Sequence, residues 1–169
     1  MSEDILVFIG PEYAQQHLAP ELSFYEDVSL SKVLHILESQ QSLWGKSSGG
    51  ATLQWCSKGK YEGETCNTPN PERPSLVILF NYRHGFHFRF DIQDEQFIAL
   101  DPTAKSSRVV HQLGGEPAYF PSASFVSLDT ARSIVTSFVR GGRRYSRVKW
   151  IESSSFRYDL PNEWKKLHA

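Results

Sequence analysis

The sequence lacks an excess of charge of either sign, and this absence limits the partners that it predicts. Lys and Arg together number 18 and Asp and Glu 19, which leaves a formal net charge of -1. Such a chain has neither the positive field that attracts nucleic acid nor the self-repulsion of a disordered acidic chain. The composition therefore predicts a folded protein that does not bind nucleic acid.

Long hydrophobic runs and secretion signals are missing as well. No stretch approaches the roughly 20 apolar residues that span a bilayer, and no basic and apolar segment opens the sequence. The two cysteines, Cys56 and Cys66, form no CxxC pair, so we expect no structural zinc site. They are either free thiols, the commoner state in the cytosol, or the ends of a short disulfide loop. These features predict a cytoplasmic protein with no membrane partner.

Motifs for catalysis and cofactor binding are also absent. The sequence has no GxSxG nucleophile elbow, no phosphate-binding GxxxxGK[ST] loop and no GxGxxG after a strand. We therefore expect no cofactor, no metal and no enzymatic activity.

Two pairs of side chains are the alternatives to this expectation. Asp101 and His111 lie on successive predicted strands, where they could form an acid and base pair, but Asp before Pro is also a common turn initiator. His84 and His87 straddle a predicted turn without the helical spacing of a metal site. The simpler interpretation is an exposed turn histidine and a solvent-facing strand histidine. A small enzyme using either pair remains the alternative function.

What the sequence does contain is a clear pattern of strands. "SLVILF" is a continuous apolar run, and "FHFRFD" places Phe86, Phe88 and Phe90 on one face, so the two predict a hairpin around "NYRHG". "FIALD" and "SRVVHQL" continue as short strands, which favours an antiparallel meander. The three phenylalanines would suit an RNA-binding sheet, a third function, but without a basic RNA-binding motif they are more typical of a core face.

Two amphipathic helices flank the meander. Residues 30–40 have apolar side chains at helical spacing, and Ser127 precedes a second such stripe that starts at Leu128 and that Gly141 is expected to end. "ILVFIG" and "RVKWI" predict a first and a last strand. The order predicts an α+β fold: an antiparallel β-meander sheet with two main helices packed on one face.

The domain organisation follows from length and composition. A chain of 169 residues with 40% hydrophobic content can bury one sizeable core, so residues 1–169 are expected to form a single domain. Residues 45–75 are rich in Gly, Ser, Pro and charge around the strand-like "ATLQWC". This region is predicted to be a long loop or hairpin insertion.

Half of the chain carries a resemblance to a known family. In "GFHFRFDIQDEQFIALDP" and "LGGEPAYFPSASFVSLDTARSIVTSFVRGGRRYSRVKW", a hairpin with an acidic turn precedes an aromatic-Pro-small stretch at residues 119–122. A helix lead at residues 126–131, a glycine after the helix and the pair Val148 and Trp150 follow. In this order the elements resemble the first-described immunity protein family of bacterial polymorphic toxin systems, which includes protectors against deaminase toxins.

The resemblance implies a cytoplasmic protein without catalytic activity that binds and occludes a cognate secreted toxin, such as a deaminase or nuclease. A tight occluder needs roughly 800 Å² per partner, with aromatic anchors inside a polar rim. The candidate anchors and the candidate acidic contacts to the basic groove of a toxin are Trp55, Tyr61, Tyr82 and Tyr158, and Glu62, Glu64, Asp94 and Glu95.

Overall fold

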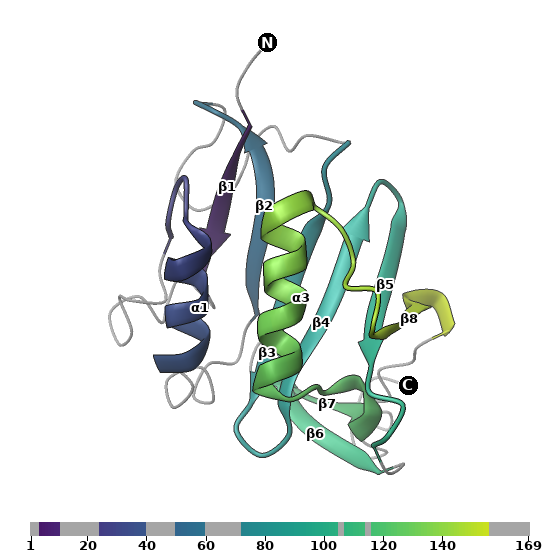
Figure 1. The fold of residues 1–169 in the computed structure, drawn as a ribbon. Coiled ribbons are helices and arrows are strands. Elements are labelled where there is room, and N and C mark those ends of the chain that lie inside the picture. The colour runs from purple at the N-terminus through teal and green to yellow at the C-terminus, as the bar shows by residue number, and fades with distance from the viewer. Residues whose placement is uncertain are drawn as a thin grey trace.

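The chain folds as an α+β structure with one large antiparallel sheet, as the sequence predicts (Figure 1). The computed structural model describes residues 4–10, 24–39, 50–59, 72–104, 107–113 and 116–155. The sheet has six strands in the order β1-β2-β3-β4-β5-β8. Their bounds are β1 Asp4–Ile9, β2 Ala51–Ser57, β3 Ser75–Asn81, β4 Gly85–Ile92, β5 Glu95–Leu100 and β8 Lys149–Glu152.

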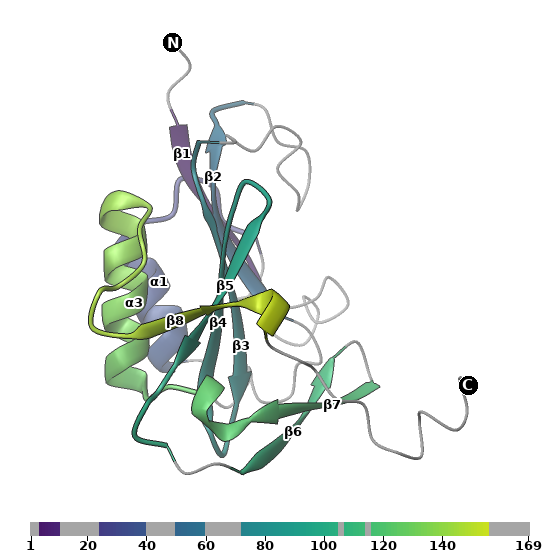
Figure 2. The same cartoon turned by 90° about the vertical axis from the view of Figure 1, so that its right-hand side faces the viewer.

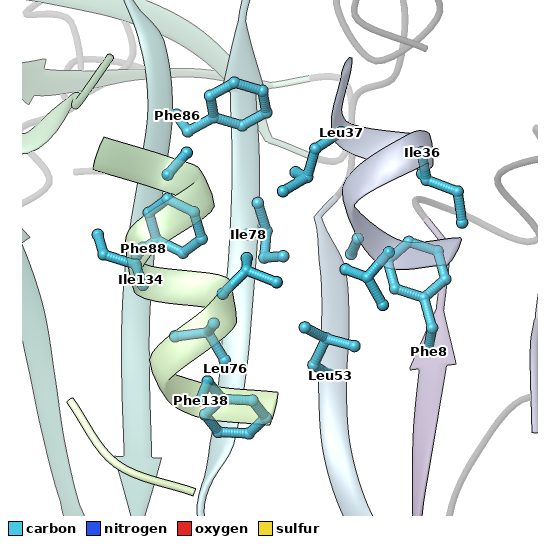
Figure 3. Packing of buried hydrophobic residues seen from close by; sticks show 14 of the residues in the cluster. Phe8, Ile36, Leu37, Leu53, Leu76, Ile78, Phe86, Phe88, Ile134 and Phe138 are labelled. Carbon is cyan, nitrogen blue, oxygen red and sulfur yellow. The ribbon is translucent and has the colours of Figure 1, made fainter. Parts of the chain in front are cut away.

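Two helices, α1 Leu30–Ser39 and α3 Leu128–Gly141, cover one face of this sheet, as the edge-on view shows (Figure 2). The three alternating phenylalanines of β4, Phe86, Phe88 and Phe90, point into the layer between sheet and helices and are at most 4% exposed. Figure 3 shows how side chains from β1, β2, β3 and both helices complete this core. Burial of this apolar area fixes the helices to that face.

The ends of α3 are defined by its own sequence. Thr130 N donates a hydrogen bond to the Ser127 side chain, 3.3 Å away, which satisfies one free amide of the first turn as predicted. The C-terminal prediction was wrong by one residue, because Gly141 is the last helical residue and Gly142 takes the left-handed conformation at φ 59°. Gly142 N donates to the carbonyl oxygen of Phe138 at 2.7 Å and closes the helix.

The second face of the sheet is where the structure departs from the predicted meander. β6 Arg108–Leu113 pairs with β7 Glu116–Pro121 in a separate two-stranded sheet. This hairpin packs against the second face, where Val109 and Phe120 lie in one apolar cluster with Ile98 of β5. The 3-10 turn η3 Ser122–Ser124 then leads to α3, and η4 Ser153–Ser155 follows β8. Within the described residues, no helix is long and apolar enough to cross a membrane.

The predicted insertion at 45–75 contains an integral strand. β2 lies inside the sheet and pairs with β1 on one side and β3 on the other. Cys56 on β2 is fully buried with Ile5 and Val7, and it is disulfide-bonded. The only other cysteine in the chain is Cys66, which lies outside the described residues. For Cys56 the structure therefore contains a disulfide bond rather than a free thiol.

A candidate partner-binding site

The predicted site residues divide between the two ends of the sheet. Asp94 and Glu95 lie at the turn between β4 and β5, whereas Tyr82 lies at the opposite end of β4, in the turn after β3. Trp55 lies on β2. The remaining four candidates fall outside the described residues: Tyr61, Glu62, Glu64 and Tyr158.

Asp94 and Glu95 line a cavity of about 220 Å³. We call it the acidic pocket, and its lining residues are Asp94, Glu95, Gln96, Glu152, Ser153 and Ser154. The structure thus places both acids of the β4–β5 turn beside a third carboxylate, Glu152, which ends β8. Sequence reasoning missed Glu152, because only the pairing of β8 with β5 brings it there.

Hydroxyl groups, rather than cations, accompany these carboxylates. Ser154 Oγ donates to Glu152 Oε2 at 3.4 Å, and Ser153 Oγ donates to Gln96 Oε1 at 3.3 Å. In the part of the chain that the structure describes, Asp94, Glu95 and Glu152 form no salt bridge with Lys, Arg or His. Three carboxylates around one cavity give it a negative potential, which favours a positively charged group from a partner.

The turn that carries Asp94 and precedes Glu95 has a strained backbone. Ile92 pairs with Glu95, so only Gln93 and Asp94 form the turn. Gln93 has φ 51°, in the left-handed region where residues other than Gly, Asn and Asp are disfavoured. Strained positions of this kind persist where the surrounding structure enforces them and cluster at functional sites. The acidic pocket therefore combines negative charge with a strained turn.

Tyr82 forms a second exposed feature at the other end of the sheet. Its side chain is 66% exposed, and the guanidinium of Arg83 lies 5.1 Å from the ring centroid. Val110 of β6, the other large hydrophobic residue exposed among those described, is tied to the same end because Asn81 Nδ2 donates to its carbonyl oxygen at 3.4 Å. Tyr and Arg are among the residue types that are enriched at the energetic centres of protein interfaces.

Trp55 has a different environment from Tyr82. It is half-buried against the main core, with the guanidinium of Arg73 5.4 Å from its ring centroid. Its indole Nε1 is buried without a hydrogen-bond partner among the described residues and faces Gly142 at the end of α3. The structure thus places Trp55 at the junction of β2 and α3.

Asp101 and His111 do not meet in a hydrogen bond. Asp101 Oδ1 accepts from the backbone N of Thr103 at 2.8 Å and from its Oγ1 at 2.7 Å, which is the geometry of a turn initiator. His111 is part of β6 and is buried, packed edge-on against Phe120 with ring centroids 5.8 Å apart. Its burial lowers the pKa of the imidazole, and its Nε2 has no partner among the described residues.

His84 and His87 differ in exposure. His84 is exposed at the turn, as predicted. The prediction of a solvent-facing His87 was wrong, because His87 is only 1% exposed. The β6–β7 hairpin and η3 cover this face of β4, and Phe120 and Phe125 pack against the His87 ring. Among the described residues, no group of three or more His, Cys, Asp or Glu is placed to hold a metal ion.

Base stacking on the sheet would require exposed aromatic rings on β4. Phe86, Phe88 and Phe90 are covered by α1 and α3 and take part in the core instead. The core interpretation of this aromatic pattern is therefore confirmed.

Comparisons of the chain with protein-family models, with curated proteins and with solved structures find no match.

Proposed function

We propose that this protein neutralises a cognate secreted bacterial toxin by binding it stoichiometrically and occluding its active domain. The observation that carries this proposal is the acidic pocket, in which Asp94, Glu95 and Glu152 gather around one cavity without a cationic partner among the described residues. The order of motifs that resembles an immunity protein family supports the same function. No catalytic activity or cofactor is part of the proposal.

The chemistry of the pocket favours a basic partner. A cavity of about 220 Å³ admits one or two Lys or Arg side chains of a partner, whose positive charge would complement the three carboxylates. A toxin that acts on nucleic acid, such as a deaminase or nuclease, presents a basic substrate groove. An acidic surface that fills this groove excludes the substrate by charge as well as by volume.

The remaining interface area would come from around the pocket, because a stable complex buries roughly 800 Å² on each partner. We place the protein in the producing cell's cytoplasm, as the resemblance implies. The disulfide at Cys56 runs against this placement, because disulfides form and persist mainly in oxidising compartments.

An enzyme that uses Asp101 and His111 is the alternative function. It has less support, because the Asp101 carboxylate accepts its hydrogen bonds within its own turn.

Co-expression with the toxin domain encoded by the neighbouring gene tests the proposal. We expect this domain to arrest growth alone, and to be silenced and co-purified at a one-to-one ratio when the protein is present. The triple variant Asp94→Asn, Glu95→Gln and Glu152→Gln should weaken the complex about tenfold or more and make its affinity depend less on salt.

A matched variant controls for net charge. Glu26→Gln, Asp27→Asn and Glu72→Gln remove the same three charges from exposed positions outside the pocket, and this protein should bind the toxin almost as the wild type does. Equal weakening by both triple variants would show that overall charge matters and the pocket does not. A harmless or non-binding neighbour would remove the proposal itself.

A further inference from the structure

The solvent side of α3 carries a cavity of about 380 Å³ that the proposed function does not use. We call it the α3 groove, and its lining residues are Arg132, Ser133, Thr136, Ser137, Arg140, Arg143 and Tyr145. Three arginines, three hydroxyl side chains and one tyrosine line it, and none of them is acidic. The groove is thus opposite in character to the acidic pocket.

The groove arises from the helical period of α3. The apolar stripe of this helix faces the sheet, so Ser133, Thr136, Ser137 and Arg140 share the opposite side at spacings of three and four residues. Short hydroxyl side chains leave a hollow there, whereas longer ones would fill it. Arg143 belongs to the segment that returns after the helix, and its Nε lies 3.1 Å from where a Cβ on Gly141 would be.

The three arginines differ in how their charge is compensated. The guanidinium of Arg132 donates to Glu38 at 2.7 Å and to Asp129, three residues earlier on the helix, at 2.9 Å. Arg140 and Arg143 have no acidic group within salt-bridge distance in the described part of the chain. Two guanidinium groups at the groove thus keep their charge available for a ligand.

The three hydroxyl side chains of the groove also differ in whether they already form a hydrogen bond within the protein. Ser133 Oγ donates to the backbone carbonyl oxygen of Asp129 at 3.1 Å, so its proton is already used. Thr136 and Ser137 make no side-chain hydrogen bond to any described residue, and both are half-exposed in the floor of the groove. They can donate to an acceptor that Arg140 and Arg143 attract.

We propose that the α3 groove binds the phosphate group of a small organic phosphate. Guanidinium groups pair with the oxygens of a phosphate through two parallel hydrogen bonds, and hydroxyl donors satisfy the oxygens that remain. The volume lies in the range of small-molecule sites, so it holds a phosphate together with an organic group such as a nucleoside. This inference does not depend on the proposed function, since the acidic pocket shares no residue with the groove.

Titration calorimetry and amide chemical shifts in chloride buffer test the inference, with inorganic phosphate, AMP and adenosine as probes. We expect AMP to bind in the micromolar to millimolar range, to shift the amides of Thr136 and Ser137, and to bind more tightly than inorganic phosphate. Adenosine should not bind, because it lacks the phosphate. Equal affinity for AMP and inorganic phosphate would overturn the assignment of an organic phosphate, and no binding of either up to about 10 mM would overturn the site.

Variants separate the groove from general surface charge. Arg140→Gln with Arg143→Gln should weaken AMP binding about tenfold or more, whereas Arg83→Gln with Arg108→Gln removes two exposed charges elsewhere and should leave it unchanged. The double variant Arg140→Lys and Arg143→Lys keeps both positive charges but lacks the planar guanidinium groups that form two parallel hydrogen bonds to phosphate. We therefore expect an intermediate affinity for AMP. Equal weakening by the two glutamine pairs would overturn the site. So would binding of a single-stranded oligonucleotide, steeply dependent on salt, without binding of AMP.

Discussion

The imidazole Nδ1 of His87 donates a hydrogen bond to the backbone carbonyl oxygen of Ser124, 3.0 Å away, in the buried layer between β4 and η3. A carbonyl oxygen only accepts, so the proton of the neutral ring is on Nδ1. Burial is the main cause that lowers the pKa of His87 to about 3; the bond to Ser124 opposes this shift, and the nearby His111 and Arg89 add to it. The structure thus holds a neutral histidine under the β6–β7 hairpin.

We expect this neutral histidine to make the fold sensitive to acid. In the unfolded chain the imidazole titrates near pH 6.5, so between pH 6.5 and about 3 the unfolded state binds a proton that the folded state does not. The contribution to the free energy of unfolding is therefore complete above pH 6.5. It falls by about 1.4 kcal/mol for each pH unit below that value. Urea unfolding between pH 7.5 and 4.5 measures the slope.

Two histidine variants identify the source of this slope. His87→Asn keeps an N–H donor near Ser124 without a titrating ring, so its free energy of unfolding should be lower at pH 7 but fall less steeply in acid. His84→Asn changes an exposed histidine of the nearby turn and should keep the wild-type slope. An unchanged slope in His87→Asn would assign the acid sensitivity to other groups, the buried His111 among them.

Gly85 occupies a position that tolerates no side chain. Its φ is 97°, and a Cβ there would overlap the carbonyl oxygen of Val126, which accepts a hydrogen bond from Phe86 N at 3.0 Å. We expect Gly85→Ala to lower the free energy of unfolding by about 3 kcal/mol, because backbone strain and steric overlap add. Gly59→Ala is the control, since φ is 73° there but nothing lies within 4 Å, and it should cost about 1 kcal/mol. Similar midpoints in urea for both variants would contradict the steric argument.

Gln93 offers a stabilising change at the acidic pocket. Glycine adopts its left-handed backbone without the Cβ penalty, so we expect Gln93→Gly to raise the free energy of unfolding by about 1 kcal/mol. The same substitution in the middle of a strand, Gln54→Gly on β2, should lower it by about 0.5 to 1 kcal/mol. Thermal unfolding of both proteins checks the opposite signs. A loss of stability in Gln93→Gly would show that the turn is not strained.

The disulfide at Cys56 predicts that the cysteines of the folded protein do not react with alkylating reagents until they are reduced. Iodoacetamide should add no mass to the folded protein without reductant, and two carbamidomethyl groups after denaturation and reduction, as counted by mass spectrometry. We expect Cys56→Ala to lower the free energy of unfolding by about 2 to 4 kcal/mol. Protein from the cytoplasm of intact cells that takes up two groups before reduction would show that the thiols are free there.

The local elements of this fold follow from local patterns. The alternation of Phe86, Phe88 and Phe90 identified β4 and its core face, and Ser127 identified the start of α3, because side-chain period and helix capping depend only on neighbouring residues. The turn acids Asp94 and Glu95 were found in the same way, as a polar interruption between two apolar strands.

The arrangement of these elements depends on contacts between distant segments. Nothing local in the sequence places the β6–β7 hairpin over His87, so the alternation of β4 predicted a histidine facing solvent. The third carboxylate of the acidic pocket was missed for the same reason, because Glu152 faces Phe97 only through the register between β8 and β5. A pairing of segments about 50 residues apart leaves no periodic signal in either segment.

The position of β8 also orders events during synthesis. β5 is translated long before β8, so a nascent chain with β1 to β5 in place still exposes one edge of β5 and has Asp94 and Glu95 without Glu152. The last strand of the sheet completes the acidic pocket and covers this edge in a single step. Fragments that end before β8 would therefore lack the complete pocket, and binding through it would be reserved for chains whose sheet is finished.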